Sequence, residues 1–167
     1  MVMMKLNDRK WRAFNVTDIF DHIPGNWPYV SSSALNNGVA DWIKLTENSR
    51  VFGESISLAN SGSVGTAFYE PFDYVASDHI TSFHLGNGSK YIYLFMAACL
   101  EKQKHNFSFN REVNEARLKR LRIMLPVNDK GQPDYSYMDQ YVKNKMNQKY
   151  NHYLKYLNAS VIGSNKL

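Results

Sequence analysis

Apolar and polar residues alternate at period two through the middle of the chain, as they do in half-buried strands. Short strands are predicted at Tyr29–Val30, Glu54–Ala59, Thr66–Tyr69, Tyr74–Ala76, Ile80–Leu85 and Leu121–Leu125. The opening Trp11–Phe20 predicts a further strand that leads into a turn. Segments rich in Gly, Asn and Pro predict turns at 24–28, 36–39, 60–65, 86–88 and 128–133. Closely spaced short strands of this kind indicate a curved or barrel-like sheet rather than βαβ units.

The pattern changes to steps of three and four residues in the second half of the chain. Lys90–Lys104 carries one helical stripe of apolar residues, and Arg111–Leu118 predicts a second short helix or an irregular segment. A long amphipathic helix of about six turns is predicted from Asp134, its candidate N-cap. Its apolar stripe consists of Met138, Val142, Met146, Tyr150, Tyr153 and Leu157.

Together these elements predict an α/β (α+β) fold. We expect a twisted, partly barrel-like sheet with a few helices over residues 1–133, and then the long helix over 134–158. Residues 159–167 are expected to form a frayed tail.

Composition limits the class of protein. The 167 residues are 44% hydrophobic and 21% charged, which is typical of one globular domain. One cysteine excludes a disulfide framework and a cysteine-based zinc site. The longest apolar run, Tyr91–Leu100, is half of the ~20 residues that a membrane helix needs. No secretory signal opens the chain, so we expect a cytoplasmic protein without a membrane partner.

The net charge of +5 is unevenly distributed. Residues 1–100 contain 7 basic and 9 acidic side chains, whereas residues 101–167 contain 13 basic and 6 acidic ones. A polyanion partner explains this excess, and so does a solvated basic helix surface.

Signatures of catalysis are scarce. There is no phosphate-binding Gly-Lys-Ser/Thr loop, no dinucleotide-binding glycine pattern and no zinc-ligand spacing among the five histidines. A hydrolase built on Ser63, Asp78 and His79 is one alternative, although no spacing supports it. The loop Asn60–Thr66 places amide and hydroxyl groups around two glycines, and Ser31–Ser33 is similarly polar. Such groups contact phosphates and base edges, or they satisfy their own backbone in a turn.

The order of these segments resembles that of the target-recognition domains of type I restriction–modification specificity subunits. The segments that carry the resemblance are Trp11–Phe20, Pro28–Ser33, Gly53–Gly65 with Ala67–Tyr69, Val75–Ile80, Leu121–Val127, and Gly131–Tyr135 with Met138. Specificity subunits typically carry two recognition domains and two long helices, whereas this chain has room for one of each. It therefore resembles a half-subunit.

The resemblance implies sequence-specific recognition of double-stranded DNA on behalf of a methyltransferase, and of a restriction subunit in systems that also cleave. The chain itself would be non-catalytic and hold no metal. S-adenosylmethionine, and ATP where it is used, would bind to partner subunits. The alternative from another class is a freestanding nucleic-acid-binding regulator, which the basic C-terminal part would also suit.

Candidate site residues follow from these observations. The candidates for contacts with bases or the DNA backbone are Ser31, Ser32, Asn36, Asn60, Ser61, Ser63, Thr66, Tyr69 and His79. The candidates for phosphate contacts are Lys102, Lys104 and Arg111. In the family such long helices hold the methyltransferase, and the stripe from Met138 to Leu157 also predicts an antiparallel homodimer that would read a bipartite palindrome. Packing of the first turns back onto their own domain is the other reading of this stripe.

Overall fold

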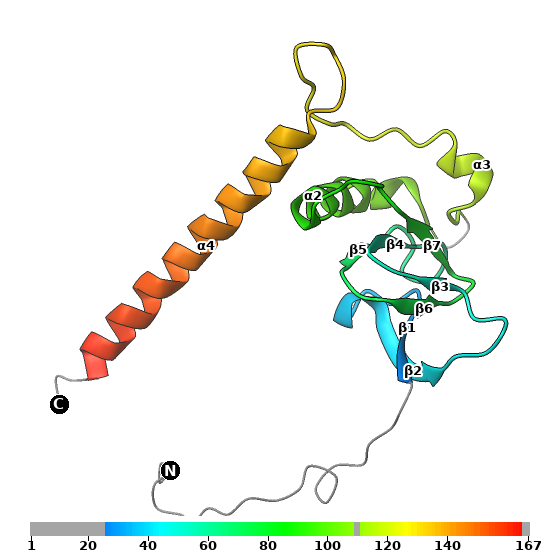
Figure 1. The fold of residues 1–167 in the computed structure, drawn as a ribbon, viewed down its shortest axis with the longest axis horizontal. Coiled ribbons are helices and arrows are strands. Elements are labelled where there is room, and N and C mark those ends of the chain that lie inside the picture. Colours follow the sequence, from blue (N-terminus) through cyan, green and yellow to red (C-terminus); the bar gives the residue numbers. More distant parts are fainter. Residues whose placement is uncertain (1–25, 109–110, 165–167) are drawn as a thin grey trace, which may run out of the picture.

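The structure, a computed structural model, describes residues 26–108 and 111–164, with Asn26 and residues 159–164 described by their backbone alone. Two small sheets are stacked beside helix α2, and the long helix α4 extends away from them (Figure 1). The predicted α/β class is therefore confirmed. No helix in the described ranges has the length and apolar character needed to cross a bilayer.

The first sheet has the strand order β2-β1-β6-β3 and the second has the order β5-β4-β7. The strands of the first sheet are β1 (Asn26–Val30), β2 (Val39–Lys44), β3 (Val51–Phe52) and β6 (Tyr74–Ala76). The strands of the second sheet are β4 (Ser55–Ala59), β5 (Ala67–Glu70) and β7 (Ile80–Phe83). All pairs are antiparallel except β1 with β6. The chain passes from β3 to β4 through Gly53, where a Cβ would collide with the Asp73 carboxylate. The described strands thus turn a corner without closing into a barrel.

Strand β4 is buried at every position, although its alternating sequence predicts one solvated face. Its apolar side chains, Ile56 and Leu58, pack in the core beneath α2 (Lys90–Glu101). Its serines face a polar layer inside the protein instead of water. Ser57 Oγ donates a hydrogen bond to Glu70 Oε1 at 2.7 Å, and the hydroxyls of Ser55 and Tyr74 lie 3.0 Å apart.

Helix α4 (Tyr135–Ser164) begins where Asp134 predicts a cap, because the Tyr137 amide donates to Asp134 Oδ1 at 2.9 Å. Its first turns pack against α2: the Met138 side chain is fully buried, and the rings of Tyr141 and Phe95 meet edge to face. The predicted end at residue 158 is too early. Residues 159–164 continue the helix, since Ala159–Ile162 contains no helix-breaking residue.

Two other predictions from the sequence need correction, two strands were missed, and one prediction is not tested. The predicted turn at 24–28 overlaps β1, and β2 and β3 were not predicted. Leu121–Leu125 does not form a described strand: its side chains alternate between half-buried and exposed, but none of the described strands pairs with it. The opening Trp11–Phe20 lies outside the described residues.

Candidate nucleic-acid interface

The loop after β4, residues 60–66, is held in place mainly by backbone hydrogen bonds. The amide of Ser63 donates to the carbonyl of Ser32 at 3.2 Å, and the amide of Gly65 donates to the carbonyl of Ala59 at 3.0 Å. Gly62 has a φ of +58°, and a Cβ there would lie 2.6 Å from Ser32 Oγ. The structure thus brings the two polar segments singled out in the sequence, Ser31–Ser33 and Asn60–Thr66, side by side.

Asn60 supports this loop through both the nitrogen and the oxygen of its side-chain amide. Its side-chain amide donates to the Asp78 carbonyl at 3.3 Å, and its Oδ1 accepts from Thr81 Oγ1 at 2.5 Å. Its backbone bonds to His79 and Val113. Asn60 therefore links the loop to residues 78–81 and to Val113, while the hydroxyls of the half-buried Ser61 and Ser63 make no hydrogen bond within the described residues.

Thr66 and Lys104 form a second support. The Thr66 side chain is buried, and its hydroxyl accepts a hydrogen bond of 2.7 Å from Lys104 Nζ. A Cβ on Gly65, which has a φ of +81°, would lie 3.0 Å from Lys104 Cα. The segment after α2 consequently packs directly against the loop.

The other sequence candidates lie around this centre or away from it. Asn36 is exposed in the short 3-10 helix η2 (Asn36–Gly38), which packs on β5, and Lys102 is exposed at the end of α2. Tyr69 stacks on Tyr93 with ring centroids 5.1 Å apart. Burial, and then the nearby Glu54 carboxylate, raise its pKa. Tyr69 thus belongs to the packing under α2 rather than to the loop.

The hydrolase alternative has no geometric support. His79 Nε2 lies 3.6 Å from Asp78 Oδ1, but both side chains are largely exposed. No hydrogen bond within the described residues joins Ser63 to this pair. A triad requires the nucleophile to bond to its base.

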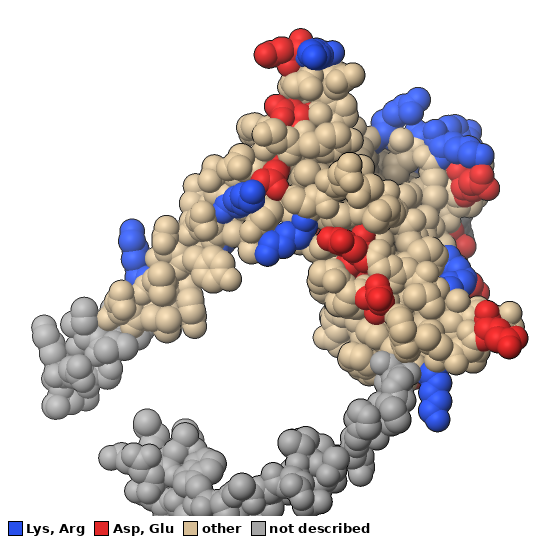
Figure 2. Space-filling model, viewed as in Figure 1, with Lys and Arg blue, Asp and Glu red and all other residues tan. Residues whose placement is uncertain are grey.

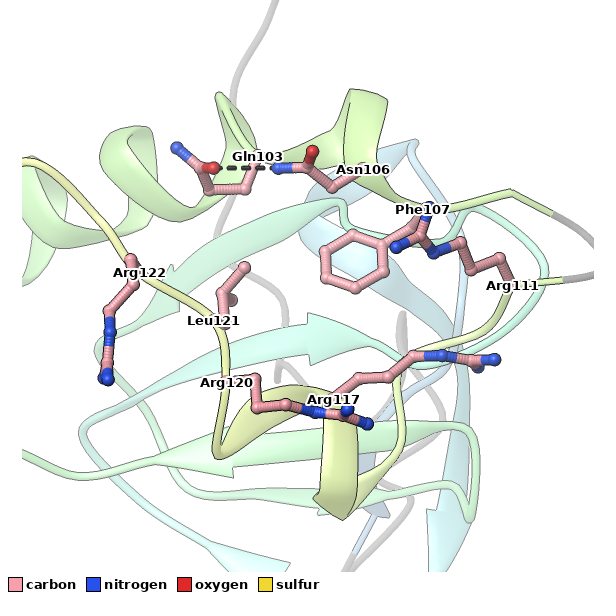
Figure 3. Close-up of a pocket in the computed structure, with 8 residues that line it drawn as sticks. All are labelled: Gln103, Asn106, Phe107, Arg111, Arg117, Arg120, Leu121 and Arg122. Carbon is pink, nitrogen blue, oxygen red and sulfur yellow. Dashed lines mark hydrogen bonds between the residues drawn. The ribbon is translucent and has the colours of Figure 1, made fainter.

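A basic hollow of about 460 Å³ adjoins the loop. It lies between the end of α2, the 3-10 helix η3 (Lys104–Asn106) and the short helix α3 (Glu115–Leu118). Four arginines line it, together with Gln103, Asn106, Phe107 and Leu121; these arginines are Arg111, Arg117, Arg120 and Arg122. Figure 3 shows the Phe107 ring in the hollow between the Gln103–Asn106 pair and the side chains from α3.

The guanidinium groups of this arginine hollow are not neutralised by the rest of the described chain. Arg117 Nη1 donates to the Glu112 carbonyl at 2.5 Å and Arg120 Nε to the Ala116 carbonyl at 3.1 Å. The ion pairs of the described residues involve Lys119, Lys143 and His79, and none of them includes these arginines. Figure 2 shows basic side chains gathered over α3.

Sequence reasoning singled out only Arg111 from this hollow. The signal for the others was present, because Arg117–Arg122 contains three arginines and one lysine in six positions. A short helix followed by an extended segment directs side chains from this run into one hollow.

A polar loop beside a basic hollow is the kind of surface with which proteins contact nucleic acid. The chain belongs to the family of type I restriction modification DNA specificity domains, whose model matches residues 10–156. It is 31% identical over 153 residues to S.BcgI, the specificity subunit of a type II restriction enzyme from Heyndrickxia coagulans. That alignment covers 84% of this chain and 45% of the relative, so the chain spans about half the length of the curated relative it matches.

Family membership confirms the resemblance stated from the sequence. It also confirms the predicted class of function, which is sequence-specific DNA recognition in restriction–modification.

Proposed function

We propose that this chain reads its DNA sequence with the loop 60–66 and the adjacent Ser31–Ser33. The observation that carries the proposal is how the loop is held. Backbone hydrogen bonds and the Asn60 side chain hold its backbone in place, while the Ser61 and Ser63 hydroxyls have no hydrogen-bond partner among the described residues. Hydroxyl groups on a rigid support can donate to and accept from base edges in the major groove.

The proposed partners follow from the family. The chain directs a methyltransferase to its site, joined by a restriction subunit in a system that also cleaves, and all of them act in the cytoplasm. The chain contributes recognition and no catalysis. S-adenosylmethionine, and ATP where it is used, bind to those subunits. A freestanding regulator is the competing function, and recovery of a methyltransferase with the native chain distinguishes the two.

The exposed part of α4 is proposed to associate with a second copy. Beyond α2 its apolar stripe is open: Tyr150 is 63% and Tyr153 57% exposed, and both line a groove of about 470 Å³ with Met146. Met138, in contrast, is covered by the chain's own fold. The first turns therefore pack back onto the domain, while the later turns present the dimer surface.

Selection of bound duplexes from a randomised pool tests the reading loop. We expect the double variant Ser61→Ala, Ser63→Ala to relax the preference at the positions it reads, at ~1–3 kcal/mol of discrimination for each good contact. Ser136→Ala, an exposed serine on α4, is the control and should select the same sequences as the parent. Unchanged preference in the double variant would contradict the loop, and a parent that enriches no sequence would contradict the function.

A further inference from the structure

We propose that the arginine hollow binds the phosphodiester backbone of one DNA strand, beside the bases that the loop reads. The inference rests on the proposed function and assigns a role to residues that the reading loop does not use. In this inference the DNA is positioned by one hollow lined with arginines rather than by lysines scattered over the surface.

The charges of the hollow are the first argument. Four arginines line one concave surface, and no carboxylate of the described residues pairs with them. Positive charge gathered at one hollow without a carboxylate partner favours an anionic ligand. Guanidinium groups also match a phosphate with two parallel hydrogen bonds, which a lysine cannot reproduce.

The free donors are the second argument. Each guanidinium has five N–H groups. Arg117 and Arg120 each use one of them on a backbone carbonyl, and this bond fixes the side chain at the hollow. The Arg111 and Arg122 guanidiniums make no hydrogen bond with described residues, so the hollow keeps most of its donors for a ligand.

Continuity with the loop is the third argument, and it favours DNA over a free anion. Phe107 lines the hollow, and its ring lies next to Gly65 of the loop: a Cβ added to Gly65 would lie 3.3 Å from Phe107 Cδ2. The Val113 amide, two residues after Arg111, donates to the Asn60 carbonyl at 2.9 Å. A strand whose bases meet the loop thus passes its backbone over the hollow, where Phe107 offers an apolar surface to a deoxyribose.

The salt dependence of binding to a random-sequence duplex tests the inference. Arg111 and Arg122 are the residues to change, because their side chains bond to nothing in the described fold. The affinity falls as salt rises, and we expect this dependence to be weaker in the double variant Arg111→Gln, Arg122→Gln. The negative slope of log affinity against log salt should become less steep by about two, and the affinity near 0.1 M salt should fall roughly tenfold per contact. The control, Lys119→Gln with Lys130→Gln, removes the same charge outside the hollow and should change the slope little.

Three results would overturn the inference. Equal losses in the arginine and lysine variants would show that charge alone matters. Saturable binding of inorganic phosphate that is lost in the double arginine variant, while its DNA affinity and salt dependence stay those of the parent, would assign the hollow to a free anion. A parent that binds no duplex would overturn the proposed function as well, so failure of the hollow alone is distinguishable.

Discussion

Glu70 is the most unusual residue of the interior. Its side chain is fully buried, one carboxyl oxygen accepts from Ser57, and the other has no partner among the described residues. Burial raises its pKa to about 7, against the smaller opposing effect of the Ser57 hydrogen bond. The polar layer between the sheets therefore holds a carboxyl group that is half protonated near neutral pH.

This pKa predicts how stability depends on pH. The folded chain binds the Glu70 proton more tightly than the unfolded chain does, so Glu70 lowers the free energy of unfolding as pH rises from about 4.5 to about 7. In Glu70→Gln this loss is absent. Between pH 5 and pH 8 we expect the stability of the variant to improve relative to the parent by about 2 to 3 kcal/mol, an order-of-magnitude value.

Urea unfolding of both proteins at the two pH values measures this difference. Glu47→Gln, an exposed carboxylate, is the matched control and should track the parent at both values. A stability difference between Glu70→Gln and the parent that is the same at pH 5 and pH 8 would contradict the raised pKa.

At the scale of elements, α4 divides into a covered part and an open part. Asp139 anchors the covered part by accepting a hydrogen bond from the hydroxyl of Ser89, the N-cap of α2, and it also pairs with Lys143 Nζ of α4, 2.6 Å away. The open part carries Lys145, Lys149 and Lys155, and no acidic residue follows Asp139 in the helix. Two such helices repel each other, so their association depends on the apolar stripe and on salt.

We expect self-association through α4 to strengthen as salt rises, because counterions screen the lysines. Met146→Glu should abolish it by placing a charge in the apolar groove. Gln148→Glu adds the same charge about 200° around the helix and should leave association unchanged. Sedimentation of the full chain at tens of micromolar, at low and high salt, measures these effects. A parent that stays monomeric throughout, or a Met146→Glu chain with the parent's mass, would refute the pair.

The elements show what sequence patterns could predict. Period two located β4 and β7, and period 3.6 located α2 and α4, because those patterns follow from local geometry. Burial of β4 on both faces was not predictable, since its serines and Glu70 satisfy one another only across the fold. Strand β3 spans two residues, too few for a pattern, and Leu121–Leu125 has the burial pattern of a strand without a partner.

The sequence predicted which types of residue form the candidate site better than it predicted what each residue does there. Ser31–Ser33 and the loop 60–66 meet in the structure, which their polar composition alone did not predict. The same composition could not show that Asn60 and Thr66 are occupied by internal bonds, whereas Ser61 and Ser63 are not. Those assignments depend on residues as distant in sequence as Lys104 and Val113.

In the whole molecule, the reading loop and the open turns of α4 lie on different parts of the structure (Figure 1). The proposed two-fold pair through α4 would therefore hold two copies of the loop 60–66 apart. We expect the parent to select duplexes with two inverted copies of one short sequence at a fixed spacing. The Met146→Glu chain should select a single copy with weaker binding. Selection of one unrepeated sequence by both chains would contradict the paired arrangement.

The way in which the loop 60–66 is held has a consequence for changing what the chain reads. The loop is held by main-chain hydrogen bonds, by two glycines, and by the side chains of Asn60 and Thr66. Ser63 contributes only its backbone, and the side chains of Ser61 and Ser63 contribute no hydrogen bond within the described residues. Exchanging those two side chains removes no hydrogen bond of the described fold. On the proposed function, we therefore expect a library restricted to these two positions to select new target sequences on an unchanged scaffold.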